Sequence, residues 1–351
     1  MSTSSSTTTR AESSQKVSGQ SQTSQADLFN TTYEYSTEGN LPEDIQRDFE
    51  IPIGSSLYTL SLSVETILDN IKPGWERAVE VLEAGEKEPE WNGSIDPDVL
   101  DRVLRHIPKN IDELKLIISE DGWYSRVVDP ANVCMHEFYI DKTDFESYNV
   151  SVEGIVGITL DNLSSAYSST KNTASIDIEF DGPERKFTVD DGTPIVQSLI
   201  DPDCLRQAPD IPNLELPNEI ALPGDELRVL LKRLTAFAHG DHVLVSGDDK
   251  TEEVTFSVES HSETIHKTYA SARDLQHPTA ENKSAFKMAT PESGETLLSG
   301  DYVKNYLTSI RKKDLNDSYT LIFGHEFPIK LRTQFSEKSF SMFMLAPRIQ
   351  A

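Results

Sequence analysis

Apolar and polar positions between residues 95 and 331 repeat one pattern four times: an amphipathic helix, a strand, a tight turn and a second strand. In the first copy, apolar residues from Val99 to Ile107 lie at helical spacing, and strand-like stretches follow at 114–118 and 123–128. Further helices are predicted near residues 160–171, 224–238 and 299–314. The spacing between helix starts, roughly 60 to 75 residues, exceeds that of common solenoid repeats and predicts two helix–sheet modules in each of two domains.

Composition divides the chain into five segments. Residues 1–40 are rich in Ser and Thr and poor in large apolar side chains, so we expect a disordered tail. Residues 41–90 form an extension of mixed composition, with a strand-like stretch at 57–62 and a helix-like one from Trp75 to Ala84. Residues 91–200 and 218–351 are the two predicted domains. Four prolines lie in residues 201–217, which we expect to be an extended connector.

The formal net charge is −27, from 59 acidic and 32 basic residues. Such a surface repels nucleic acid over most of its area and suits a cytoplasm at molar salt, where the Debye length is about 3 Å. An acidic protein from an ordinary cytoplasm is the alternative. We see no signal peptide or membrane segment, and Cys134 and Cys204 indicate neither a disulfide framework nor a metal site. A reducing cytoplasm is therefore the expected location.

The predicted helices depart from this acidic balance, with net charges of +1, 0, +1 and +2 in chain order. Basic residues opposite apolar helix faces indicate a surface that meets phosphates. The alternative is that acidic first turns and basic last turns only complement the helix dipoles. The candidate DNA-contacting residues are Arg102, Arg105, Lys109, Lys171, Arg228, Lys232, Arg233, Lys304, Arg311, Lys312 and Lys313.

Five segments resemble archaeal sliding clamps of the proliferating-cell-nuclear-antigen (PCNA) type. The hairpin at 121–133 ends in Asp-Pro-Ala-Asn-Val, the segment 145–148 reads Phe-Glu-Ser-Tyr, and 199–212 resembles the family's interdomain connector. Residues 240–243, Gly-Asp-His-Val, resemble the Ser-Asp-His turn of that family, and residues 345–349, Leu-Ala-Pro-Arg-Ile, resemble its C-terminal tail. The segments follow the family's order over about 240 to 260 residues, the length of a whole family member.

The resemblance implies an α+β fold of two tandem DNA-clamp domains, each with two helices packed on curved antiparallel sheets. It implies a homotrimer that forms a pseudo-sixfold ring around double-stranded DNA and slides along phosphates without reading bases. The chain would then be a non-enzymatic processivity factor in the nucleoid, without cofactor, metal or membrane partner. Its partners would be the clamp loader, DNA polymerase, nuclease and ligase, which dock through PIP-box-type peptides. The implied pocket beneath the connector comprises Val128, Asn132, Val133, Leu205, Pro209, Ile211, Pro212, Ala346, Pro347 and Ile349.

Three departures from the family keep a divergent paralogue, or an interaction module without ring closure, open as alternatives. The first departure is an N-terminal extension of roughly 90 residues, which leaves two positions for the first strand of the family. A gap-free alignment places that strand at Trp91–Ile95, whereas the alternative, Leu57–Ser63 followed by a helix at Val64–Ile71, requires a long insertion. We prefer the first because it gives the first helix its basic face. Pro194 falls near an edge strand and removes a donor, and Ser260–Thr264 replaces an acidic segment of the family.

An enzyme reading rests on His239-Gly-Asp-His242 followed by Gly247-Asp-Asp249, which resemble metal ligands of phosphoesterases. The signal is weak, because Gly and Asp are expected at a helix end and in a hairpin turn. Four further histidines, at 136, 261, 266 and 277, are predicted to be ordinary surface or hairpin residues.

Overall fold

The computed structural model describes residues 64–85, 88–169, 175–207, 216–237, 242–259, 264–270, 287–290, 292–314 and 317–348. The side chains of 64–73, 165–169, 237, 287–289 and 313 lie outside this description. The predicted tail at 1–40 and the strand-like stretch at 57–62 therefore fall outside the described residues.

The first half of the described chain contains two copies of the predicted pattern. The helix of the first copy begins at Pro97, where Asp96 accepts a hydrogen bond from the backbone N–H of Asp98 at 2.7 Å. The elements are α1 (Val64–Ala84), β1 (Glu90–Ile95), α2 (Pro97–His106), β2 (Glu113–Ile118), β3 (Gly122–Val128), β4 (Cys134–Asp141), η4 (Lys142–Asp144), β5 (Phe145–Val152), β6 (Gly154–Thr159), α3 (Leu160–Ser169), β7 (Ile176–Asp181), β8 (Lys186–Asp190) and β9 (Ile195–Ser198).

Strand β1 lies where the gap-free alignment expects the first strand, and it pairs with both β5 and β7. Helix α1 includes the predicted helical stretch Trp75–Ala84 and starts at Val64, where the other alignment expects a helix. Because β1 is an inner strand of the first half, the structure favours the gap-free alignment.

The second half contains the other two copies. Its elements are η5 (Pro202–Cys204), β10 (Asn218–Pro223), α4 (Gly224–Phe237), β11 (His242–Asp248), β12 (Glu253–Glu259), β13 (Thr264–Ala270), β14 (Lys287–Ala289), β15 (Gly294–Ser299), α5 (Gly300–Leu307), η7 (Lys312–Asp314), β16 (Ser318–Phe323), β17 (Ile329–Gln334) and β18 (Phe340–Leu345), the first of them in the predicted connector.

Helix α5 is shorter than the predicted helix at 299–314. The hydroxyl groups of Thr308 and Ser309 donate to the carbonyl oxygens of Asn305 and Tyr306 at 2.7 and 2.6 Å. Such local bonds compete with the helical hydrogen-bond ladder and favour a helix end. Residues 312–314 form only a short 3-10 turn, so the cations there do not belong to the helix.

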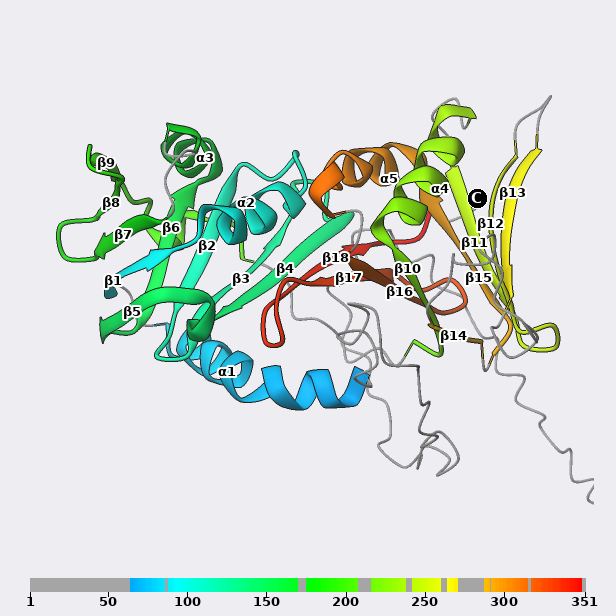
Figure 1. Ribbon diagram of the computed structural model, residues 1–351, viewed down its shortest axis with the longest axis horizontal. Coiled ribbons are helices and arrows are strands. Elements are labelled where there is room, and N and C mark those ends of the chain that lie inside the picture. The colour runs from blue at the N-terminus through cyan, green and yellow to red at the C-terminus, as the bar shows by residue number, and fades with distance from the viewer. Residues whose placement is uncertain are drawn as a thin grey trace, which may run out of the picture.

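Three antiparallel sheets hold these elements together. A five-stranded sheet, β5-β1-β7-β8-β9, lies at one end of the molecule, and a four-stranded sheet, β13-β12-β11-β15, at the other (Figure 1). A nine-stranded sheet, β14-β10-β16-β17-β18-β4-β3-β2-β6, runs through both halves. Its β18–β4 pair, from Phe340↔Tyr139 to Leu345↔Cys134, joins the halves.

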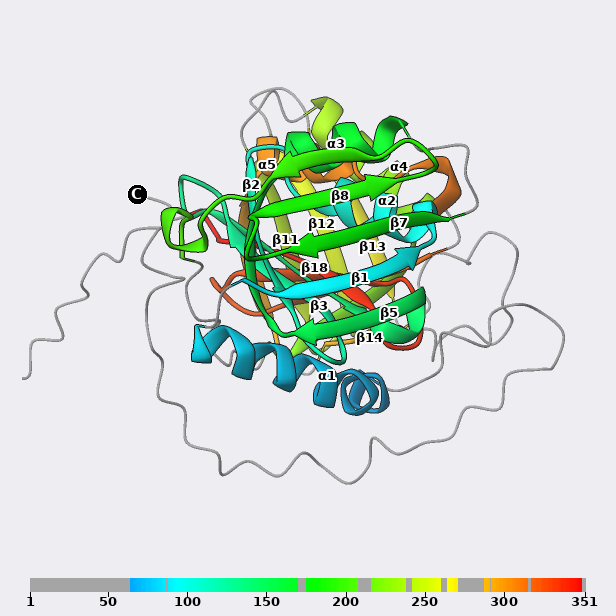
Figure 2. The same cartoon turned by 90° about the vertical axis from the view of Figure 1, so that its left-hand side faces the viewer.

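Helices α2, α3, α4 and α5 lie along one face of the sheets, whereas α1 lies on the opposite face (Figures 1 and 2). Each half has its own apolar core, one around Trp91, Trp123 and Phe180 and one around Leu230, Phe256 and Phe323. We call the face with the four helices the helix face and the opposite side of the nine-stranded sheet the outer face. In the described part of the chain, no helix combines the length and apolar character that a membrane crossing requires.

Two histidines are buried in these cores, which corrects the surface reading of His136. Its Nε2 lies 2.7 Å from the Ser341 hydroxyl, and Nε2 of His106 lies 3.2 Å from the Tyr319 hydroxyl. Burial, which disfavours the charged ring, lowers the pKa of His106 to about 4 and that of His136 to about 3. Both rings are therefore neutral in the folded protein at pH 5.

We expect the protein to lose stability as pH falls from 7 to 5. The unfolded chain binds protons on these imidazoles below a pKa of 6.5 while the folded chain does not, so each costs about 2 kcal/mol of unfolding free energy over that range. Urea unfolding at fixed salt measures the loss, and His106→Gln should reduce the pH dependence. An unchanged pH dependence in that variant would contradict the assignment.

Candidate nucleic-acid interface and partner-docking site

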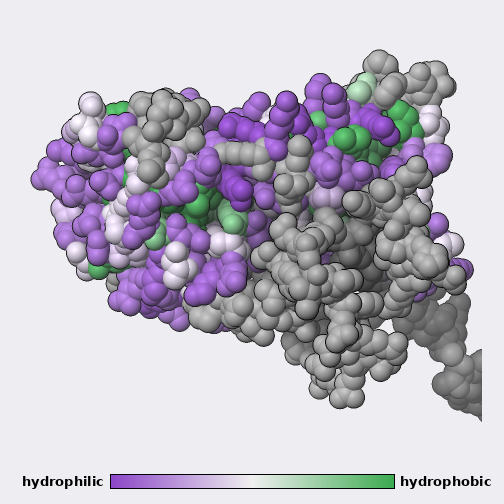
Figure 3. All heavy atoms as spheres, in the orientation of Figure 1, coloured by the Kyte–Doolittle hydropathy of each residue, from purple (hydrophilic) through white to green (hydrophobic). Residues whose placement is uncertain are grey.

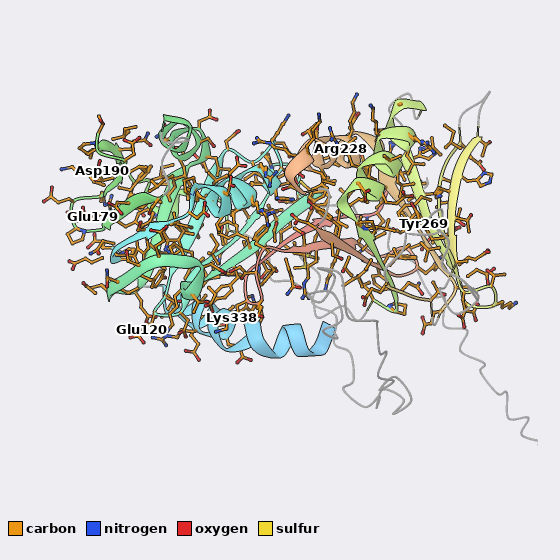
Figure 4. All side chains as sticks on the ribbon, viewed as in Figure 1. Glu120, Glu179, Asp190, Arg228, Tyr269 and Lys338 are labelled. Atoms are coloured by element: carbon orange, nitrogen blue, oxygen red, sulfur yellow. The ribbon has the colours of Figure 1, made fainter. Side chains whose placement is uncertain are left out.

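Six of the predicted DNA-contacting cations are exposed, and five of them, all except Arg311, have no ion pair with another described residue and come from the helix face and the segments that follow its helices. These five are Lys109 after α2, Lys232 and Arg233 on α4, Lys304 on α5 and Lys312 in η7. Arg228 on α4 is half-buried and lies on the same side (Figure 4). Lys171 and the side chain of Lys313 lie outside the described residues.

Three other predicted cations are tied to carboxylates at the boundary between the halves. Arg105 was predicted to contact DNA, but its side chain is only 5% exposed and its guanidinium contacts the fully buried Asp314. Arg102 lies 3.7 Å from Asp317, and Arg311 lies 3.2 Å from Asp101. Arg105 therefore joins α2 to the second half and is not available to phosphates.

The helix face is not uniformly basic. Asp98, Asp161, Asp225 and Asp301 are exposed in the first turns of α2, α3, α4 and α5, where carboxylates complement the helix dipole. Figure 3 shows hydrophilic residues over α5 and apolar residues over part of α4, where Val229 is exposed. The described part of the helix face therefore carries charges of both signs together with some apolar residues.

The predicted Asp-Pro-Ala-Asn turn is organised by Asp129, which is 1% exposed. Its carboxylate accepts hydrogen bonds from the backbone N–H groups of Val133 and Cys134 at 2.7 and 2.8 Å. The side-chain amide of Asn110 donates to it at 3.0 Å, and the Tyr302 hydroxyl on α5 donates at 2.8 Å. Asp129 therefore fixes the turn and connects it to the second half.

The start of the connector reaches this turn. Arg206 donates to the Asn132 side-chain oxygen at 3.0 Å and to the Pro130 carbonyl at 3.2 Å, and Asn132 has a φ of 53° that asparagine tolerates better than most residues. Leu205 is buried beside β6, where a Cβ on Gly157 would lie 2.8 Å from it. The predicted pocket residues at 209, 211, 212 and 349 lie outside the described residues.

An apolar cluster lies on the outer face next to this turn. It consists of Val128, Met135, Met344 and Ala346, and we call it the outer-face cluster. Val128 and Ala346 were predicted to line the partner-peptide pocket. So was Pro347, which is buried and follows Ala346 in the sequence. Met135 and Met344 were missed, because only the pairing Met344↔Met135 between β18 and β4 brings them together.

Val133 does not lie with the outer-face cluster. It packs against the core of the second half, and its carbonyl accepts a hydrogen bond from the Ala346 backbone N–H at 2.9 Å. Val133 was predicted to line the pocket with its side chain, and this prediction is wrong. Its contact with the outer-face cluster is made by its backbone.

The metal-site reading finds no support in the geometry. His242 begins β11 and Asp248 ends it, about 20 Å apart at the rise of an extended strand. His239 and Asp241 lie outside the described residues, and among the residues that are described, no group of three or more His, Cys, Asp or Glu side chains is placed to hold a metal ion. Cys134 and Cys204 are both free thiols.

Comparisons with known proteins identify the family. No family model matches the chain. A DNA polymerase sliding clamp of Natronomonas pharaonis is 31% identical over 259 residues, which cover 73% of this chain and 98% of that protein. One of Haloarcula marismortui is 31% identical over 264 residues, covering 74% and 99%. The chain belongs to the DNA polymerase sliding clamp family.

Solved structures agree with the clamp fold. The A. fulgidus PCNA bound to the C-terminal region of FEN-1 aligns with a TM-score of 0.64 at 23% identity, covering 74% of this chain and 99% of that chain. PCNA from Thermococcus kodakaraensis aligns with a TM-score of 0.63 at 17% identity, covering 74% and 100%. The α+β architecture of two tandem clamp domains is thereby confirmed, and the haloarchaeal relatives fit the acidic composition of this clamp.

The two remaining departures concern the ends of this clamp. Strand β9 begins at Ile195, and all four of its residues pair with β8. Pro194 therefore precedes the strand and removes no hydrogen bond from the β8–β9 pair. Of the segment at 260–264, only Thr264, the first residue of β13, is described.

Proposed function

We propose that this DNA polymerase sliding clamp closes into a homotrimeric ring around double-stranded DNA. The carrying observation is that all four helices of the repeat lie on one face while the outermost strands β9 and β13 lie at opposite ends (Figure 1). Head-to-tail pairing of two different edges generates a closed ring when the rotation fits. Exposed Val196 on β9, at 58% exposure, supports an interface there.

In the proposed ring, the helix face forms the lining of the hole. Lys109, Lys232, Arg233, Lys304 and Lys312 meet phosphates without base contacts, and the acidic surface faces away from DNA. Because electrostatic affinity falls by orders of magnitude at high salt, enclosure is the mode of retention that suits such a cytoplasm. The chain acts at the nucleoid, without catalysis or cofactor.

The outer-face cluster and the connector together form the proposed docking site for partner peptides. The A. fulgidus PCNA relative binds the C-terminal region of FEN-1. By analogy, clamp loader, polymerase, nuclease and ligase present PIP-box-type peptides. The four residues of the outer-face cluster are buried, so the apolar side chains of such a peptide pack over the cluster at the half-buried Met342 and Asn132.

The test is retention on closed DNA. The protein is loaded by its clamp loader onto a nicked circular plasmid, purified in molar KCl, and the plasmid is then cut once. We expect comigration with the circle and release after cutting, together with a trimeric mass by light scattering. Equal retention on linear DNA would refute enclosure, and a monomer at micromolar concentration would favour an interaction module without ring closure.

A further inference from the structure

Helix α1 is firmly docked on the outer face. Its side chains Ala78 and Val81 are buried against five strand residues of the nine-stranded sheet, namely Ile117, Tyr124, Tyr139, Ile155 and Phe340. Two polar anchors flank this contact: the Trp75 indole N–H donates to Glu137 at 3.0 Å, and Arg77 donates through Nε to Glu153 at 3.2 Å. Both apolar burial and directed bonds therefore hold the helix in place.

The docked helix is an immediate neighbour of the outer-face cluster. Met342 on β18 packs against both groups of residues. On β4, Tyr139 under α1 and Met135 in the cluster point to the same face, four residues or about 13 Å apart. A peptide seated on the cluster would therefore lie close to α1.

Glu137, between these two residues on β4, links the two regions electrostatically. It is 3% exposed and accepts from the Tyr124 hydroxyl at 2.7 Å as well as from Trp75. Burial opposes the charge of Arg126, but Glu137 and Tyr124 together outweigh this effect and raise the pKa of Arg126. Helix α1 is therefore part of one packed network with the sheet that carries the docking cluster.

The solvent side of α1 is acidic and stands above the sheet. Glu76, Glu80 and Glu83 are exposed along it, and a helix with its side chains is about 10–12 Å thick. The 73% of this chain that matches the curated relatives covers 98% of one of them, and α1 precedes the first strand of the fourfold repeat. Helix α1 therefore lies outside the fourfold repeat and next to the proposed docking site.

We propose that α1 is a selectivity element of the docking site. It admits partners that reach the outer-face cluster through an extended peptide and rejects partners whose folded body, particularly an acidic one, follows that peptide directly. This inference rests on the proposed partner-docking function. Its physical basis is exclusion: a rigid helix beside the anchoring cluster adds a steric penalty for the wrong partner, and its exposed carboxylates add a like-charge penalty that grows as the salt concentration is lowered.

The experiment compares one peptide in three contexts. The probe is a synthetic peptide with the sequence of the C-terminal region of FEN-1, used free, fused directly to a small acidic folded carrier, or fused through a flexible Gly/Ser linker of about 20 residues that spans about 25 Å. Affinities are measured by isothermal titration in molar KCl with the full chain. We expect the free and long-linked peptides to bind equally and the directly fused one about tenfold more weakly.

Undocking the helix should remove this difference. Ala78→Glu and, independently, Val81→Asp place a charge in the apolar contact, so the directly fused probe should regain the affinity of the free peptide. Glu83→Gln, on the exposed side, is the matched control and should keep most of the difference. Hydrogen exchange verifies the design: amides of residues 75–84 exchange faster in the two undocking variants, while β3 and β4 stay protected.

Each outcome has a separate meaning. Equal binding of all three probes to the unaltered chain, or no recovery on undocking, would overturn the selectivity role. Weaker binding of the directly fused probe after undocking would also overturn the selectivity role, because it would mean that α1 contacts the partner favourably. If the free peptide bound none of the variants, the proposed docking site itself would fail.

Discussion

Asp314→Ala is expected to lower the unfolding free energy by about 3–5 kcal/mol. The Asp314 carboxylate is fully buried, contacts the Arg105 guanidinium and accepts the Arg311 backbone N–H at 2.7 Å. Its removal leaves a guanidinium that is 5% exposed, with Asp101, at 3.6 Å, as its remaining ion-pair partner in the described part of the chain. Urea unfolding at fixed salt and protein concentration measures the loss.

Arg311→Ala is the matched control for that experiment. Arg311 joins the same network through Asp101, but its side chain is 52% exposed, so its removal should cost less than about 1 kcal/mol. Equal costs for the two variants would show that the buried pair does not hold the halves together. Because the pair connects α2 to the second domain, Asp314→Ala should also reduce the fraction of closed trimer in light scattering.

Asp129→Ala is expected to cost about 3 kcal/mol and to weaken partner-peptide binding by about tenfold. The substitution removes the acceptor for the backbone N–H groups of half-buried Val133 and buried Cys134, and for the Tyr302 hydroxyl. The turn that positions Asn132 against the connector would then lose its internal support. Urea unfolding and isothermal titration with the free peptide measure the two effects.

Asn110→Ala separates this role from general loosening of the region. Asn110 gives Asp129 a single 3.0 Å hydrogen bond, so its loss should cost only about 1 kcal/mol and leave peptide affinity nearly unchanged. The interpretation fails if Asp129→Ala proves no more damaging than Asn110→Ala in either measurement.

The order and type of the repeated elements could be predicted from the sequence because their signals are local. Helical spacing from Val99 to Ile107 and the apolar stretches at 114–118 and 123–128 are local patterns, and α2, β2 and β3 occur where these patterns predict them. The end of α5 was missed, because the hydroxyl groups of Thr308 and Ser309 terminate the helix within a sequence whose apolar spacing continues.

The family, too, could be recognised from sequence, since the turn that contains Asp129 and the C-terminal tail are contiguous motifs. What each charged side chain does was decided by tertiary structure. Arg105 and Lys109 belong to the same predicted basic surface, yet one is buried against a carboxylate 209 positions away and the other is exposed.

For the docking site and helix α1, too, the sequence predicted local elements and the tertiary structure decided their contacts. Sequence alone predicted a helix at Trp75–Ala84 and several pocket residues, but neither the pairing of Met135 with Met344 nor the placement of α1 beside them. Periodicity reports which residues avoid water, because it depends only on positions a few residues apart. Which buried surfaces meet, and which charges become paired, depends on contacts between distant segments that exist only once the chain has folded.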